Sequence, residues 1–183
     1  SDSADKAARF VMNCNQDRVP ILFIHDVNGF IVGKEAEWGG IAKDGAKLVN
    51  AVSNSVVPKI SMVVGGSYGA GNYAMSGRSY RSRFIFAWPS AVVSVMGGDQ
   101  AASTLSQIKL ARMGNVDDDT RRKVYDEIKE AYDIKSDIRY GAARLWVDEI
   151  IDPLDSRKVL IQSLDTISHQ GDLDRFNVGV IQV

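Results

Sequence analysis

The stretch from Val64 to Gly77, VGGSYGAGNYAMSG, contains five glycines in fourteen residues and follows an apolar run. Glycine has no side chain beyond its hydrogen, so a ligand can approach its main chain closely. A strand that passes through glycines into a helix also presents free backbone N–H groups, which bind a negatively charged oxygen. The first question is therefore which anion this stretch binds.

The two common phosphate-binding motifs do not fit these glycines. A P-loop needs Lys and then Ser or Thr after its last glycine, whereas Asn72 and Tyr73 follow Gly71. A dinucleotide motif would begin with Gly69 and Gly71, but residues 90–94, where the ribose-binding acid is expected, contain no carboxylate. We reject the P-loop and disfavour the dinucleotide site.

The remaining chemical use is an oxyanion hole, in which preorganised backbone N–H groups face an oxygen that becomes negative during reaction. Two glycine-bearing loops, residues 28–33 and 65–71, each follow a short buried strand and would supply one N–H group each. Glycine clusters also serve tight turns, and the residues alone leave both interpretations open.

Side chains that could act as nucleophiles or acids are few. Cys14 falls in an amphipathic helical pattern and is interpreted as a packing residue. Ser67 lacks the GxSxG environment, and His25 has no identifiable partner, so we expect His25 to form local hydrogen bonds. Glu35 and Glu37, two residues apart, give weak support for a paired-carboxylate hydrolase.

Composition narrows the class further. The 183 residues fit one compact domain, and 22 basic against 23 acidic side chains leave a net charge of −1. This balance disfavours a nucleic-acid or membrane-surface partner, and no apolar run is long enough for a membrane span. One cysteine and two distant histidines exclude a zinc site of ordinary spacing, so we expect no metal and a cytoplasmic protein.

Hydrophobic periodicity predicts alternating helices and strands, hence an α/β layer architecture. Gly45 falls on the buried face of one predicted helix, which indicates a close approach to a neighbour. The predicted helices are 2–17, 41–57, one opening at 72, 97–114, one opening at 117–119 and 152–169, and the predicted strands are 19–24, 59–66, two around Pro89 and 143–152.

Four ordered blocks resemble one known family. They are NGFIVGKEAEWGGIAKDGAKLVNAV, VPKISMVVGGSYGAGNYAMSGRSY, FAWPSAVVSVMGGDQAA and ARLWVDEIIDPLDSRKVL. Together they are similar to the carboxyltransferase β subunit of biotin-dependent acyl-CoA carboxylases, nearest to the methylcrotonoyl-CoA branch. The resemblance spans nearly the whole chain and covers the C-terminal half of such a subunit.

The resemblance implies a crotonase-like (ClpP/crotonase) fold of repeated ββα units, with residues 1–183 forming the single biotin-side domain. It implies that Gly69, Ala70 and Gly71 form the catalytic oxyanion hole for the ureido oxygen of biotin. It further implies that Gly29, Phe30 and Ile31 bind biotin, and that Asn72 and Tyr73 lie near the acyl substrate.

The implied partners are an acyl-CoA, a biotin carboxylase, a biotin carrier protein that brings the cofactor, and further copies of the chain. A mitochondrial location is implied for a eukaryotic source. No protein base is needed in this chemistry, because the ureido group of biotin can itself take the substrate proton. Three alternatives remain: a glutaconyl-CoA-type decarboxylase subunit, a non-catalytic assembly module, and a hydratase or thioesterase of the same fold.

Overall fold

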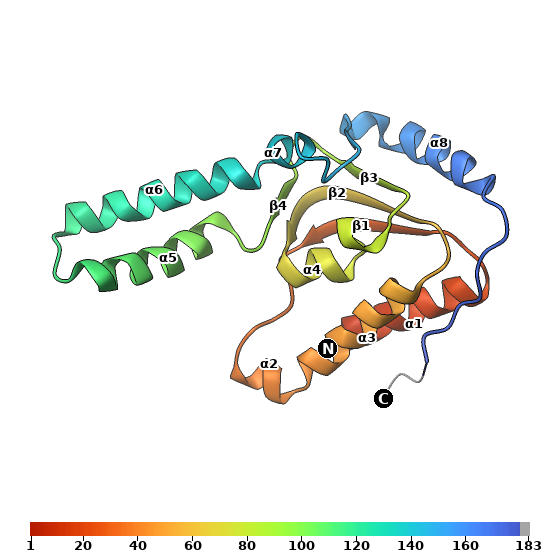
Figure 1. The fold of residues 1–183 in the computed structure, drawn as a ribbon, viewed down its shortest axis with the longest axis horizontal. Helices are drawn as coiled ribbons and strands as arrows, with labels where there is room; N and C mark the ends of the chain where they lie inside the picture. The colour runs from red at the N-terminus through yellow and green to blue at the C-terminus, as the bar shows by residue number, and fades with distance from the viewer. Residues whose placement is uncertain (180–183) are drawn as a thin grey trace.

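The computed structural model describes residues 1–179 and has the α/β architecture that the sequence predicts (Figure 1). The helices are α1 (Asp2–Gln16), α2 (Lys34–Trp38), α3 (Ile41–Asn54), α4 (Gly69–Ala74), α5 (Gly98–Met113), α6 (Asp118–Ser136), α7 (Ile138–Ala142) and α8 (Ser156–Ser168), with 3-10 turns η1 (Arg78–Tyr80) and η2 (Pro153–Asp155). The strands are β1 (Ile21–Val27), β2 (Lys59–Tyr68), β3 (Phe84–Ala87), β4 (Val92–Ser94) and β5 (Glu149–Ile150). Within residues 1–179, none of these helices is both long and apolar enough to cross a bilayer.

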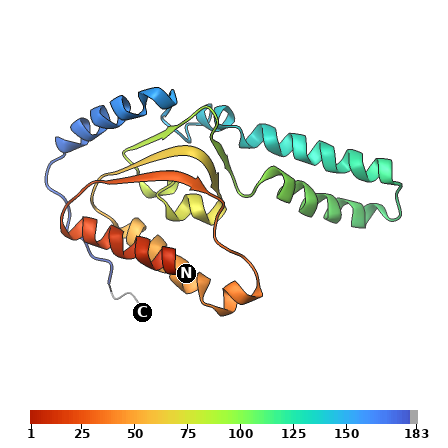
Figure 2. The same ribbon diagram turned by 180° about the vertical axis from the view of Figure 1, so that it is seen from behind.

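The strands form one parallel sheet in the order β1-β2-β3-β5, and β4 pairs with the far end of β2. Parallel sheets are usually covered on both faces, which is consistent with the apolar strands, although Leu22 and Ile24 on one face of β1 are exposed. On one face, α1 and α3 pack against Ile21 and Phe23 of β1. On the other face, Ile167 of α8 packs against Ile60 and Met62 of β2. Figures 1 and 2 show this three-layer arrangement from opposite sides.

Helices α5 and α6 form an antiparallel hairpin that extends away from the sheet (Figures 1 and 2). The sequence locates its ends well. Gly114 ends α5 with a positive φ of 80°, and the Asp117 carboxylate caps α6 by accepting a hydrogen bond from the Thr120 N–H at 2.6 Å. Ion pairs join the two helices, including Lys129 Nζ to Asp99 Oδ1 at 2.8 Å.

Two local predictions need correction. The predicted strand over 143–152 is strand only at Glu149–Ile150, because Trp146 turns back and its N–H donates to the Gly141 carbonyl at 3.0 Å. Residues 34–38, where no helix is predicted, form the five-residue helix α2. No element is predicted beyond residue 169, and residues 170–179 contain neither helix nor strand, whereas residues 180–183 lie outside the described part of the chain.

Candidate active site

The first two glycines of the glycine-rich stretch belong to an irregularity in β2 rather than to a loop. Strand β1 advances two residues, from His25 to Val27, while its partner β2 advances four, from Val63 to Ser67. The extra residues of β2 include Gly65 and Gly66. The Gly66 N–H donates to the Asp26 carboxylate at 3.1 Å, and a Cβ on Gly65 would collide with the same carboxylate.

Gly65 is therefore needed because Asp26 occupies the space a side chain would fill, and a Cβ on Gly66 would lie 2.6 Å from the Tyr68 ring. Gly65 and Gly66 thus have a structural role, but in a β-bulge within β2 rather than in a tight turn. The bulge ends at Ser67, and Tyr68 is the last residue of β2.

Residues Gly69–Gly71, called the glycine turn, form the first turn of α4. Gly69 has a positive φ of 48°, and a Cβ on it would lie 2.8 Å from the Val95 carbonyl oxygen. Backbone N–H groups in the first turn of a helix have no carbonyl partner within that helix. The turn therefore offers N–H donors at the end of a central strand, as the sequence predicts for an oxyanion hole.

The second loop, residues 28–33, lies directly against the glycine turn. A Cβ on Gly71 would lie 2.9 Å from the Gly29 Cα and 2.8 Å from the Val27 side chain, so only glycine fits at position 71. Gly29 itself has a φ of 102°, a conformation that favours glycine. Two loops far apart in sequence thus meet backbone to backbone.

Phe30 connects this loop to α3. Its ring lies 3.0 Å from the position of a Cβ on Gly45, and this confirms that Gly45 marks a close approach. The absence of a side chain at position 45 lets the aromatic ring approach the helix closely. Gly45 therefore fixes the place of Phe30 beside Gly29.

The two loops form one wall of a mainly apolar pocket of about 350 Å³. Its other walls come from the first turns of α1, from α3 and from the end of α4. Gly29, Phe30, Ile31 and Gly71 all line it, so four of the eight predicted site residues are brought together. The full lining is Ser1, Ser3, Ala4, Ala7, Phe23, Val27, Gly29, Phe30, Ile31, Ile41, Leu48, Gly71, Ala74 and Met75.

The other four predicted residues lie outside this pocket. Gly69 and Asn72 line a separate cavity of about 420 Å³ beside β4, α6 and α7, and Ala70 is exposed at the tip of the turn. The ring of Tyr73 packs edge to face on Tyr80 with centroids 4.8 Å apart. Burial, with a smaller contribution from Tyr73, raises the pKa of Tyr80 to about 12.

The Asn72 side chain forms a hydrogen bond within the protein, a role that sequence analysis did not predict. Its Nδ2 donates to Ser67 Oγ at 2.8 Å, and Ser67 Oγ lies 2.8 Å from His25 Nδ1. His25 is fully buried, and its Nε2 lies 2.8 Å from the Met75 carbonyl oxygen. The prediction that His25 forms local hydrogen bonds is confirmed. The alternation of Ile21, Phe23 and His25 along β1 places His25 on the buried face, and this pattern could have indicated its burial from the sequence.

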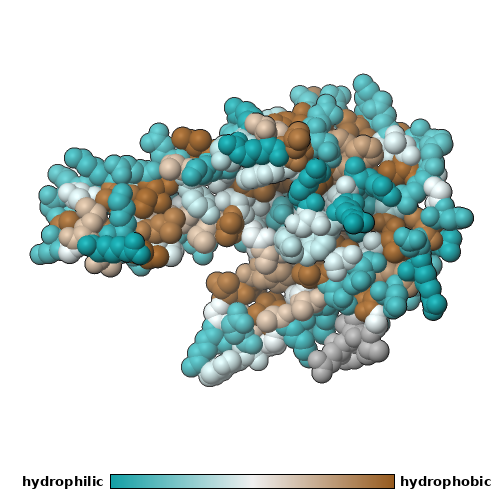
Figure 3. Space-filling model, viewed as in Figure 1, coloured by the Kyte–Doolittle hydropathy of each residue, from teal (hydrophilic) through white to brown (hydrophobic). Residues whose placement is uncertain are grey.

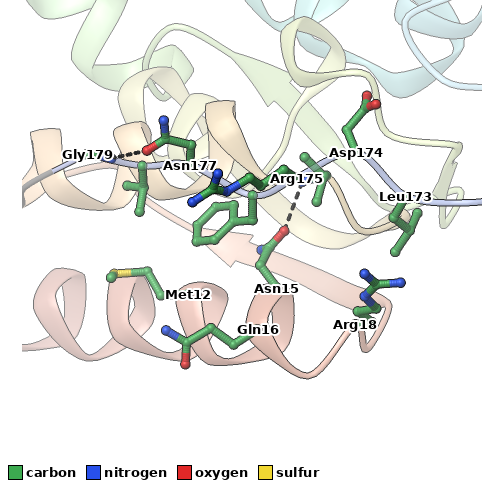
Figure 4. Close-up of a pocket in the computed structure, with 12 residues that line it drawn as sticks. Met12, Asn15, Gln16, Arg18, Leu173, Asp174, Arg175, Asn177 and Gly179 are labelled. Atoms are coloured by element: carbon green, nitrogen blue, oxygen red, sulfur yellow. Dashed lines mark hydrogen bonds between the residues drawn. The ribbon is translucent and has the colours of Figure 1, made fainter.

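A larger hollow, of about 590 Å³, lies at the opposite end of α1 (Figure 4). It is bounded by Met12, Asn15 and Arg18 on one side and by the tail from Leu173 to Gly179 on the other. Asn15 Oδ1 accepts a hydrogen bond from the Val56 N–H at 2.8 Å in this region. None of the predicted site residues lines the hollow, so we place the candidate site at the two glycine loops.

Two glycine loops that meet beside a parallel sheet covered by helices agree with the crotonase-like fold that the resemblance implies. The carboxyl transferase domain family matches residues 1–176, and the chain belongs to that family. The family resemblance and the crotonase-like fold class are both confirmed.

Several relatives are close in sequence. The mitochondrial methylcrotonoyl-CoA carboxylase beta chain of Dictyostelium discoideum is 48% identical over 177 residues, which cover 93% of this chain and 30% of the relative. The biotin-dependent 3-methylcrotonyl-coenzyme A carboxylase beta1 subunit of Mycobacterium tuberculosis is 44% identical and covers 100% of this chain and 35% of the relative.

Solved structures agree with this assignment. The beta subunit of geranyl-CoA carboxylase from P. aeruginosa superposes with a TM-score of 0.83 at 42% identity, over 96% of this chain and 34% of that chain. A transcarboxylase 12S structure, described as a hexamer assembly, gives a TM-score of 0.83 at 33% identity, over 98% of this chain and 34% of that one. The chain thus spans about a third of the length of these proteins.

Proposed function

We propose that this chain is the biotin-side, C-terminal domain of a carboxyltransferase subunit, which moves a carboxyl group between biotin and an acyl-CoA. The observation that carries the proposal is the contact of Gly71 with Gly29 at the edge of an apolar pocket. The names of the relatives support it, because they are carboxylase and carboxyltransferase subunits.

The residues present fit the ring system of biotin. A compact ring with an apolar underside and a carbonyl oxygen at one end needs close access to backbone and an apolar wall. Gly29 and Gly71 bring the main chains of the two loops together at the edge of the pocket, because Val27 and Gly29 occupy the space that a side chain at position 71 would need. Phe30 and Ile31 supply apolar surface, and Ile31 is exposed at the rim of the pocket.

In this proposal the N–H groups of Gly69, Ala70 and Gly71 bind the ureido oxygen, and biotin when bound carries the transferred carboxyl group. Preorganised donors need no rearrangement when negative charge develops, and this is how they lower the barrier. Phe30 and Ile31 exclude water from the ring. The exposed Tyr73 ring and the edge of Asn72 face the region where the acyl-CoA half of the subunit would bring its substrate.

Relatives named for methylcrotonoyl-CoA support a branched, unsaturated acyl group. They are 43% to 48% identical to this chain, whereas the methylmalonyl-CoA carboxyltransferase of Propionibacterium freudenreichii and an acetyl-/propionyl-coenzyme A carboxylase beta6 subunit are 35% and 36% identical. We infer that the carboxyl group is exchanged with the γ-carbon of such an acyl-CoA.

A biotin carboxylase, a biotin carrier protein and further copies of the subunit complete the proposed assembly. The related transcarboxylase 12S protein forms a hexamer, which supports a multimeric state.

Figure 3 shows apolar residues on the outer surface of the α5–α6 hairpin, where Leu105, Ile108 and Ile134 are exposed, and such residues suit a subunit contact. Relatives named mitochondrial support a mitochondrial location for a eukaryotic source, and for a bacterial source we propose a cytoplasmic one.

The test uses a chimera in which residues 1–176 replace the matching region of the M. tuberculosis beta1 subunit. Chimera and parent are mixed with free biotin and with 3-methylglutaconyl-CoA, methylmalonyl-CoA or malonyl-CoA. We expect biotin-dependent loss of the carboxyl group, read as the decarboxylated CoA ester by chromatography, and strongest with the first compound. A folded chimera that assembles like its active parent but gives no product would favour the assembly-module alternative.

A further inference from the structure

A chain of hydrogen bonds in buried and partly buried surroundings lies beside the glycine turn. It links Asn72 to Ser67, Ser67 to His25, and His25 to the Met75 carbonyl, each at 2.8 Å. His25 and Ser67 have no exposed surface. Among the described residues, every buried side-chain nitrogen and oxygen has a hydrogen-bond partner.

The chemistry of these groups fixes the direction of each bond. A carbonyl oxygen can only accept, so His25 Nε2 must carry a proton and donate to Met75. In a neutral ring Nδ1 then has a free lone pair, which accepts the Ser67 hydroxyl proton. Ser67 Oγ in turn accepts from the Asn72 amide. The chain is complete only with neutral, Nε2-protonated His25.

The hydrogen-bonded residues flank the glycine turn on both sides in sequence. Ser67 precedes Gly69 by two residues on β2, and Asn72 directly follows Gly71 on α4. Met75 lies one residue beyond the end of the same helix, and His25 comes from β1. The three side chains therefore tie α4 to two strands on either side of the turn.

We propose that His25 is a positioning residue, whose neutral ring holds the N–H groups of the glycine turn in place and whose protonation releases them. This inference rests on the proposed function of the turn as an oxyanion site. A protonated ring would direct Nδ1–H at Ser67 Oγ, so the Ser67 proton would lose its acceptor. It would also bury a charge in an uncharged network, which is costly.

The surroundings of His25 favour the neutral state. Burial lowers the pKa of His25 from its usual 6.5, and the hydrogen bond to Met75 opposes this in part. The charged groups that face it are few: Arg78 lines the same cavity of about 260 Å³, with its guanidinium 4.0 Å from Asp148. Asp26, the next residue of β1, is held on the Gly66 N–H.

The sign of the pH effect follows. In the unfolded chain His25 takes up a proton near pH 6.5, whereas in the folded chain it does so only at lower pH. The contribution of His25 to the free energy of unfolding therefore decreases as the pH drops below 6.5. The decline ends at the lowered pKa of the folded state. The turn is then released at acidic pH and held at neutral pH.

The first test does not depend on activity. ¹⁵N NMR of the imidazole rings reports the tautomer of His25, and the exposed His169 gives the only other histidine signal. We expect the Nε2–H tautomer at neutral pH, and Gly69–Gly71 amide signals that move together with the protonation of His25. His25→Gln should abolish that movement, because a glutamine amide can donate to Met75 and accept from Ser67 at every pH. An Nδ1–H tautomer, or amide signals indifferent to His25, would overturn the inference.

The second test uses the active chimera of residues 1–176 in the M. tuberculosis subunit. His25→Leu removes both bonds, and we expect about a ten-fold or larger fall in kcat at pH 8 with a smaller change in KM for free biotin. His25→Gln should retain most of the turnover and lose the acidic decline. Ser67→Ala is the second variant if His25→Leu does not fold.

The outcomes separate the two proposals. A folded His25→Leu or Ser67→Ala chimera with wild-type kcat, or a Gln variant that keeps the acidic decline, would refute the positioning role. A chimera with no turnover at all would count against the proposed function, and the NMR experiment would still decide whether His25 holds the turn.

Discussion

Gly71 and Gly29 touch through their main chains: a Cβ on Gly71 would lie 2.9 Å from the Gly29 Cα, closer than side-chain carbons normally approach. Neither residue could reach the other without the parallel pairing of β1 and β2, which aligns Val27 with Ser67. The contact joins the two loops that sequence analysis could only consider one at a time. It also makes the site sensitive to a single methyl group.

Gly71→Ala is expected to damage both activity and stability. The added methyl must displace the Gly29 loop, because its neighbours there are backbone atoms and the Val27 side chain. Overpacking of this kind costs about 1–3 kcal/mol. Biotin-dependent turnover of the chimera should fall by about a hundred-fold, because the displaced turn no longer holds its N–H donors in place.

Gly114→Ala is the matched control for this variant. Gly114 has a φ of 80° but nothing within 4 Å of a Cβ, so strain costs some stability without affecting the site. Urea unfolding and turnover are measured for both variants. Wild-type turnover in Gly71→Ala would remove the glycine turn from the mechanism.

Gly45→Leu is expected to weaken biotin binding indirectly, through the Phe30 ring that lines the pocket. Its side chain would displace the Phe30 ring, which lies 3.0 Å from the Cβ position. KM for free biotin should rise by about ten-fold, with kcat less affected, since binding rather than transition-state contacts is lost. Ala46→Leu, exposed on the same helix, should leave KM unchanged. Equal KM values in the two variants would mean that Phe30 does not form the biotin wall.

Asn15 is expected to be among the polar residues whose loss costs most stability. Its Oδ1 accepts from the N–H groups of Val56 and Val57, and its Nδ2 donates to the Val11 carbonyl, all in buried or partly buried surroundings. Asn15→Ala leaves the N–H groups of Val56 and Val57 unpaired and should lower the free energy of unfolding by about 3 kcal/mol. Asn54→Ala, at an exposed site, should change it by less than about 0.5 kcal/mol, and urea unfolding compares the two.

Lys59 is expected to make stability rise at alkaline pH. Burial, helped by nearby Arg83, lowers the pKa of Lys59 to about 8, although its Nζ donates to the Val52 and Ser55 carbonyls. Between pH 8 and the unfolded value of 10.5 the unfolded chain binds more protons, so this residue's contribution rises with pH. The gain is at most about 1.4 kcal/mol per pH unit.

Lys59→Met provides the comparison for this pH effect, since it nearly keeps the length of the side chain without the charge. The difference between wild type and variant in the free energy of unfolding should move in favour of wild type from pH 8 to pH 10. A difference that stays constant over that range would show that Lys59 keeps its ordinary pKa in the folded chain.

The elements that sequence analysis located well are those fixed by nearby residues. The 3.6-residue periodicity predicted α1 and α3, Gly114 and Asp117 predicted the turn between α5 and α6, and Asp152 with Pro153 predicted the start of the last helix. The close approach at Gly45 also followed from one glycine on an apolar face.

What escaped prediction depends on pairing between distant segments. The sequence does not distinguish the structural role of Gly65 and Gly66 from that of Gly69 and Gly71. The register of β1 against β2 places the first pair in a bulge. The division of the predicted site between two cavities follows from the same register. Ser67 and His25 are partners only because their strands are adjacent.

The projecting α5–α6 hairpin implies an order of folding. Its two helices need only each other and the short turn at residues 114–117, so its contacts close small loops. The junction of Gly29 with Gly71 closes a loop of about forty residues and has to wait for strand pairing. In pulse-labelled hydrogen exchange, the α5–α6 hairpin should therefore become protected while the glycine turn is still open to solvent.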